Sequence, residues 1–182
     1  MSPLNKIPKI KIHDSLAAHL GGPEEIENFS LSLLDVARLA GHLCPSVAGA
    51  YLITQAAVQA LFPNGICERG LLQVEIPGSD SEGVNGPMAQ VISYITGAWP
   101  QTGFAGLHGQ YVRKNLMHFN SDKLQKGHFR FTRTDSYQVV EVAYFPNRAK
   151  FTARGDGPFG ELWQHRVNDI LSTPEVIEVF RL

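Results

Sequence analysis

Cysteine is scarce in this sequence, since only Cys44 and Cys67 carry a thiol among 182 residues. Two cysteines cannot form a disulfide framework, so the chain is unlike small secreted scaffolds and a reducing, cytoplasmic setting is expected. Excess charge of either sign is also lacking, because 16 basic and 17 acidic residues leave a net charge of −1. A chain with this balance has no electrostatic footprint for nucleic acid or for an anionic membrane.

Long apolar runs are missing as well. No stretch reaches the length that a bilayer span needs, and the polar, lysine-bearing start of the chain is unlike a signal peptide. The sequence nevertheless contains 43% hydrophobic residues, which is enough to bury a core without covalent staples. We therefore expect one domain covering residues 1–182, with no membrane partner.

Hydrophobic periodicity predicts an α+β fold. Helical patterns cover residues 13–20, 32–39, 45–62, 87–95, 158–171 and 174–180. Alternating patterns cover residues 70–76 and a hairpin at 127–133 and 137–145, and residues 110–119 favour a strand over a helix. The 45–62 helix is apolar almost all round, which predicts a central buried helix packed against a mixed or antiparallel sheet. Residues 1–12, with two prolines, are expected to form an extended arm.

The junction between the 32–39 and 45–62 helices carries the best candidate for chemistry. His42 and Cys44 stand two residues apart, and Pro45 is suited to the first turn of the second helix. Cys44 is then expected beside a helix N-terminus, where free amide groups favour a thiolate. A histidine and a cysteine thiolate at one bend can hold zinc or a similar divalent ion.

The motif Gly41-His42-Leu43-Cys44-Pro45, with Gly49 and Tyr51 after it, resembles the opening motif of the FmdE-like family, which is named after the E component of formylmethanofuran dehydrogenase. The run Val91–Gly97, which ends in Thr-Gly, is similar to a second family motif. The resemblance implies a cytoplasmic metal-binding protein and a homodimer with an interlocked segment. It carries His42 and Cys44 over as ligands.

Other family positions differ in this sequence. Pro87 and Gln90 stand where the family has a cysteine and an aspartate, and Ala98 stands where it has another cysteine. Many members also carry a C-terminal zinc ribbon with paired Cys-x-x-Cys, which this sequence does not have.

His108 is the candidate that completes the metal site. It lies in a loop with glycine on both sides, which can bring it close to another element. Three ligands, His42, Cys44 and His108, leave the fourth zinc position for water or a substrate. A second His-Cys set from a neighbouring copy of the chain is the alternative. Asp35, one to two turns before His42, is a candidate to orient that imidazole, or else a surface partner of Arg38.

Two further functions stay open beside a zinc-binding FmdE-like protein. One is a metal-free binding or regulatory module that holds a small molecule at the glycine-rich segment 97–109. The other is an enzyme that uses Cys44 as a nucleophile.

Overall fold

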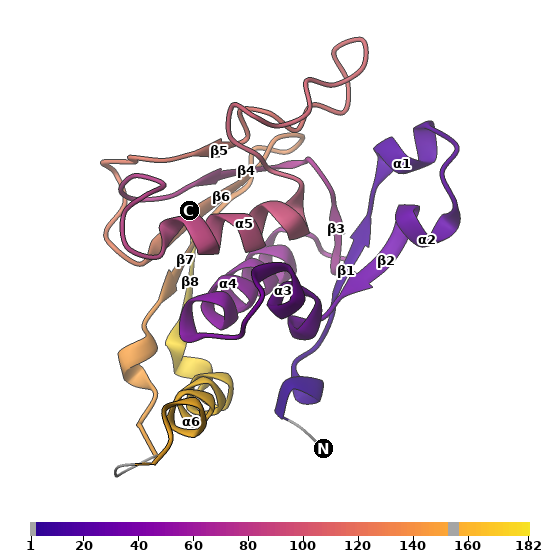
Figure 1. Ribbon diagram of the computed structural model, residues 1–182. Helices are drawn as coiled ribbons and strands as arrows, with labels where there is room; N and C mark the ends of the chain where they lie inside the picture. Colours follow the sequence, from indigo (N-terminus) through magenta and orange to yellow (C-terminus); the bar gives the residue numbers. More distant parts are fainter. Residues whose placement is uncertain (1–2, 153–156) are drawn as a thin grey trace.

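Helix α4 (Pro45–Leu61) runs through the middle of the molecule, and the other elements pack around it (Figure 1). Ten of its 17 residues are buried, because it is apolar on nearly every side and its small residues let neighbours approach closely. The computed structural model describes residues 3–152 and 157–182 and shows the predicted α+β domain with this helix at its centre.

The other helices are α1 (Ser15–His19), α2 (Glu24–Glu27), α3 (Leu33–Ala40), α5 (Asn85–Thr96) and α6 (Phe159–Leu171), with 3-10 turns η1 (Pro3–Lys6), η2 (Pro146–Arg148) and η3 (Pro174–Val176). The strands are β1 (Ile10–His13), β2 (Asn28–Leu31), β3 (Ile66–Glu68), β4 (Leu72–Glu75), β5 (Met117–His118), β6 (His128–Arg133), β7 (Val139–Tyr144) and β8 (Ile177–Arg181). Within the described residues, no helix combines the length and the apolar character needed to cross a membrane.

The strands form two sheets. The small sheet has the order β2-β1-β3, in which β1 is antiparallel to β2 and parallel to β3. The large sheet has the order β5-β4-β6-β7-β8, with only the β4–β5 pair parallel. One set of alternate residues of the large sheet is buried in the core with α4 and α5. The buried sheet residues include Val74, Phe131, Val140 and Val142.

The opposite set of side chains on the large sheet carries a row of charges. Glu75, Arg130 and Glu141 are direct neighbours across β4, β6 and β7. Arg130 forms ion pairs with Glu141 at 3.3 Å and with Glu75 at 3.8 Å, and His128 Nδ1 lies 2.7 Å from Glu141. Because every charge in this row has an opposite neighbour, the row stabilises the register of the strands.

Two predicted elements are wrong. Residues 174–180 form η3 followed by strand β8. The spacing of their apolar side chains suits a helix as well, but pairing with β7 satisfies their backbone hydrogen bonds as a strand. Residues 110–119 are mostly irregular, and only the two-residue strand β5 remains of the predicted strand. The small sheet is absent from the sequence-based prediction. Residues 1–12 are predicted to form an extended arm. Their described part is extended at Ile10–Ile12, and this segment belongs to β1, the central strand of the small sheet in the same chain.

A long segment, residues 97–116, projects from the body after α5 and is fastened to the small sheet (Figure 1). Arg113 is only 6% exposed, and its Nη2 donates to Asp14 at 2.7 Å. Asp14 also caps α1 and pairs with Arg69 at 3.3 Å. Gly70 and Gly97, both with positive φ, leave room for the guanidinium, since a Cβ at either would lie within 2.6 Å of Arg113 Nη1. The irregular segment is therefore anchored by a buried ion pair.

Candidate functional site

The bend between α3 and α4 forms as the sequence predicts. Helix α3 ends at Gly41, whose φ of 74° is the left-handed conformation that glycine adopts readily. Cys44 is the N-cap of α4, and its Sγ accepts a hydrogen bond from the Val47 amide at 3.4 Å. Pro45 occupies the first turn, where its missing N–H leaves no donor unsatisfied.

The two predicted ligands at this bend differ in accessibility. His42 is exposed, and its Nδ1 lies 2.9 Å from the Ala40 carbonyl oxygen. When Nδ1 carries the proton it donates to that carbonyl, which leaves Nε2 free to bind a metal. The Cys44 side chain is on the interior side of the bend and is 9% exposed.

The other two predicted site residues have different surroundings. His108 is exposed in a tight turn between Leu107 and Gln110, with a φ of 49°. Asp35 accepts hydrogen bonds from the Ser32 amide at 2.8 Å and the Ser32 hydroxyl at 2.6 Å, which lower the pKa of its carboxyl group. Asp35 is thus the capping partner of Ser32 at the start of α3 and lies 3.6 Å from Arg38. Its described contacts are with these residues and not with His42.

The described residues contain no group of three or more His, Cys, Asp or Glu side chains close enough to hold a metal ion. His42, Cys44 and His108 are therefore not brought together within one copy of this chain. The zinc site stays a prediction, and a site of four ligands requires donors beyond those that one described copy gathers.

A cavity of about 560 Å³ lies beside the bend, and we call it the hinge pocket. Two helices contribute their first turns to it, with Pro45 and Ser46 of α4 and Val84, Asn85 and Met88 next to or in α5. The rest of the lining comes from the large sheet and the segments that flank it: Lys126, Gly127, Phe129, Tyr144, Phe145, Pro146, Asn147 and Arg148. Its volume falls within the range of small-molecule sites.

The hinge pocket has a positive electrostatic potential. Both α4 and α5 begin at it, on the left in Figure 1, so the positive ends of two helix dipoles meet there. Lys126 adds a full positive charge and Arg148 adds a second one that Glu178 partly offsets, and no acidic side chain is among the described lining residues. Arg148 stacks on Phe145 at 3.9 Å and pairs with Glu178 at 3.0 Å, which fixes its position at the edge.

Tyr144 fastens the sheet wall of the hinge pocket to α4. Its hydroxyl donates to the Pro45 carbonyl oxygen at 2.7 Å, and burial raises the pKa of the phenol, so it stays a neutral donor. The ring lies directly against Gly49, where a Cβ would be 2.4 Å from the nearest ring carbon. Gly49 is therefore required for this close packing.

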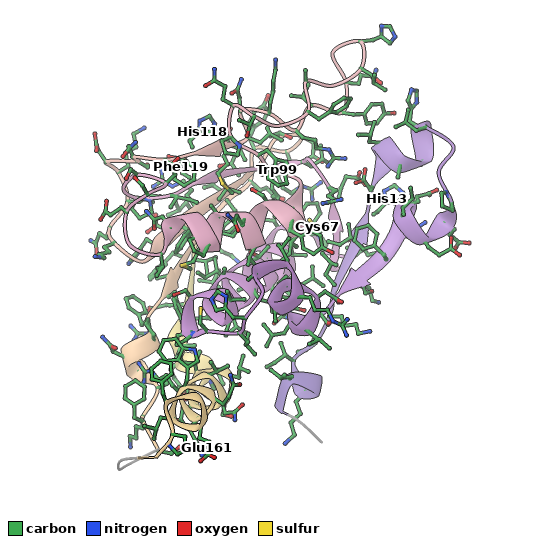
Figure 2. All side chains as sticks on the ribbon, in the orientation of Figure 1. His13, Cys67, Trp99, His118, Phe119 and Glu161 are labelled. Carbon is green, nitrogen blue, oxygen red and sulfur yellow. The ribbon has the colours of Figure 1, made fainter. Side chains whose placement is uncertain are left out.

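The glycine-rich segment borders a different, smaller cavity of about 360 Å³. Trp99 and Phe119, which are labelled in Figure 2, line it together with residues of α5. Asp80 lies at its edge, and no cationic side chain is among its described lining residues. This cavity at residues 97–109 has room for a ligand but lacks the charge that distinguishes the hinge pocket.

Sequence reasoning did not find Lys126, Arg148 or Tyr144 as site residues. Lys126 lies two residues before β6, Tyr144 is the last residue of β7 and Arg148 ends η2. All three are about 80 residues or more from Pro45 in the sequence, and the register of the large sheet brings them to it. The signal available in the sequence was Gly49 within an otherwise apolar helix, since an interior helical glycine indicates a close neighbour.

A scan against protein-family models and a search of curated proteins found no match for this sequence.

Proposed function

We propose that the chain is a small-molecule-binding protein whose hinge pocket holds a ligand with an anionic group and a flat apolar body. The observation that carries the proposal is the combination of an aromatic wall with two helix N-termini and two cations at one cavity. This is the metal-free binding module considered among the alternatives above, placed at the bend instead of at the glycine-rich segment.

The ligand chemistry follows from the two kinds of residue that line the pocket. Phe129, Tyr144 and Met88 offer apolar and aromatic surface to a ring or a short chain. Lys126, Arg148 and the first turn of α4 favour a carboxylate, sulfonate or phosphate on the same ligand.

Two fluorescent probes with a common ring system test this. Anilinonaphthalene sulfonate carries an anionic group, and phenylnaphthylamine is the neutral counterpart. We expect the sulfonate to bind the folded protein more tightly than the amine. The double variant Lys126→Gln with Arg148→Gln should weaken sulfonate binding by about tenfold, because exposed charge contacts contribute up to ~1 kcal/mol each. Binding of the neutral probe should not change.

Two control variants separate binding in the hinge pocket from nonspecific binding elsewhere on the protein. Lys123→Gln removes a neighbouring exposed lysine that is not part of the pocket lining, and it should leave both affinities unchanged. Val84→Trp, at a half-exposed lining residue, should exclude both probes. If the sulfonate binds equally well to wild type, the double variant and Val84→Trp, the hinge pocket is not its site and the proposal is wrong.

A second candidate is zinc binding of the kind that the FmdE-like resemblance implies, with His42 and Cys44 as ligands. It is favoured by one observation: a backbone carbonyl lies next to His42 Nδ1, an arrangement that leaves Nε2 available. Two copies of the chain would together supply two imidazoles and two thiolates, which is a full tetrahedral set.

Metal analysis of the purified protein tests this candidate. We expect about one zinc per two chains, lost in His42→Ala and in Cys44→Ser but retained in His165→Ala, which changes an exposed histidine of α6. Zinc content that does not fall in the Cys44→Ser protein contradicts it.

A homodimer and a cytoplasmic location belong to the same proposal. Both cysteines are free and buried, which agrees with a reducing setting. Light scattering on the wild-type protein and on His42→Ala tests whether dimer formation depends on the proposed shared metal.

A further inference from the structure

A third cavity, of about 690 Å³, lies where the two sheets meet, and we call it the sheet-junction cavity. His13, Glu68, Phe62, Leu71 and Arg133 are among the residues that line it. None of its described lining residues belongs to the hinge pocket.

His13 and Glu68 are neighbours at the carboxyl ends of the two parallel strands β1 and β3. Loops and side chains at the carboxyl ends of parallel strands are where ligands bind in open α/β sheets. The residues one position earlier, Ile12 and Cys67, are also paired and are fully buried. Because side chains alternate along a strand, His13 and Glu68 point the other way, toward the cavity. Figure 2 labels His13 and Cys67 in this part of the fold.

Glu68 holds the imidazole of His13 in one orientation. His13 Nδ1 lies 2.5 Å from Glu68 Oε2, while the Ser15 hydroxyl and amide donate to Glu68 Oε1 at 2.5 Å and 3.2 Å. An Nδ1 proton donated to the carboxylate leaves Nε2 as the basic atom, with Glu27 Oε1 3.5 Å from it. This is the arrangement of a histidine base and the carboxylate that orients it.

The charged groups around His13 set its proton affinity. The hydrogen bond with Glu68 is the largest influence and raises the pKa of His13 above its usual 6.5, burial acts in the opposite direction, and the Glu27 carboxylate, 3.5 Å from Nε2, raises it further. Arg133 lines the same cavity but is paired with Asp135 at 2.5 Å, which neutralises its charge. A raised pKa makes the unprotonated imidazole of His13 a stronger base, which favours proton abstraction.

We propose that His13 is a catalytic general base in the sheet-junction cavity, positioned by Glu68, and that it removes a proton from an uncharged, flat small molecule. The apolar wall of Phe62 and Leu71 takes the body of such a molecule, and the neutralised Arg133 gives no preference for an anion. The substrate C–H or O–H bond breaks, its electron pair stays on the substrate, and the proton bonds to Nε2. The resulting imidazolium is stabilised by Glu68 and Glu27.

The elimination of nitrobenzisoxazole is the probe reaction. A base removes the ring C–H proton, the electron pair forms the nitrile, and the N–O bond breaks to release a coloured phenolate, so no other reactant is needed. We expect turnover by the wild-type protein that rises with pH through the His13 pKa. His13→Gln should lose about tenfold or more of the rate, and the control His165→Gln should lose none.

The pH profile separates positioning from a structural role. Glu68→Gln keeps the hydrogen-bonding shape but removes the charge, so it should slow the reaction and move the midpoint of the rate profile to lower pH. Glu27→Gln should move the midpoint in the same direction with a smaller loss of rate. A nitrogen-detected titration of the His13 ring in each folded variant should give the same midpoints as the rate. If His13→Gln retains the wild-type rate, or if the midpoint of the pH–rate profile is the same in Glu68→Gln as in the wild type, the proposal is refuted. Because the hinge pocket is untouched, sulfonate binding must stay unchanged in all of these variants.

Discussion

Replacing Gly49 by alanine tests the packing that closes the hinge pocket. A Cβ at this position would lie 2.4, 2.6 and 2.9 Å from three carbon atoms of the Tyr144 ring. Carbon atoms prefer separations of about 3.5–4.0 Å, so the ring must move by about 1 Å or more. Overpacking of this kind costs about 1–3 kcal/mol, and the shift breaks the Tyr144 hydrogen bond to Pro45, which contributes about 1 kcal/mol. Alanine gains back about 1 kcal/mol in helix propensity.

The net expectation for Gly49→Ala is a loss of about 1–3 kcal/mol in the free energy of unfolding. For a domain of this size that loss lowers the melting temperature by roughly 2–12 °C. Urea unfolding followed by circular dichroism measures it. Gly160→Ala is the matched control, because Gly160 is also helical and has no atom within 4 Å of an added Cβ. The control should be unchanged or slightly more stable. A Gly49→Ala protein as stable as the control would refute the close contact between α4 and the Tyr144 ring.

Three further outcomes are expected. The His13 pKa is raised in the folded state, so protonated His13 adds to the free energy of unfolding. This contribution is fully present below about pH 6.5 and is lost as the pH rises through the folded pKa. Urea unfolding at several pH values should show the decrease, and Glu68→Gln should make it smaller. Asp14→Asn should destabilise the fold by about 3–5 kcal/mol, since it leaves the buried guanidinium of Arg113 without its carboxylate, whereas the exposed Asp122→Asn should change little in the same assay. Cys67 is fully buried, and burial raises the pKa of its thiol to about 12. Peptide mapping after iodoacetamide treatment should therefore find Cys67 unlabelled in the native protein and labelled in urea. Labelling of Cys67 in the native protein would contradict its placement in the core.

Much of the fold follows from periodic patterns that are long enough to be unambiguous. The α4 helix, the 127–145 hairpin and the bend at Gly41 to Pro45 all have local signals, and each forms where the sequence predicts it. The small sheet has no comparable signal, because its strands have only three or four residues and each is stabilised by partners far away in the sequence. Strand β8 was missed for a related reason: its spacing of apolar residues suits a helix as well, and pairing with β7 decided the outcome.

Side-chain burial was harder to predict than the elements themselves. Phe159 and Trp163 have the spacing of a core face, yet Phe159 is 75% exposed and stacks on Trp163 at the surface of α6. Around the bend, the sequence identifies His42 and Cys44 by residue type, but their partners depend on tertiary contacts. Lys126 and Tyr144 reach the hinge pocket through sheet register, and Glu68 reaches His13 through a parallel pairing across 55 residues. Such pairings between distant residues leave no local pattern in a single sequence from which they could be predicted.

The ion pair between Asp14 and Arg113 spans 99 residues, and so does the hydrogen bond between Pro45 and Tyr144. A ribosome releases the chain from its N-terminus, so the first sheet and Arg69, which follows it, emerge long before Arg113, the second arginine that pairs with the buried Asp14. Until then Asp14 has Arg69 as its only described arginine partner, at 3.3 Å, and the buried ion pair that anchors the 97–116 segment to the first sheet is incomplete. Completion of this fold must therefore wait until Tyr144 has been synthesised and released, which makes the nascent chain dependent on residues made long after its first sheet.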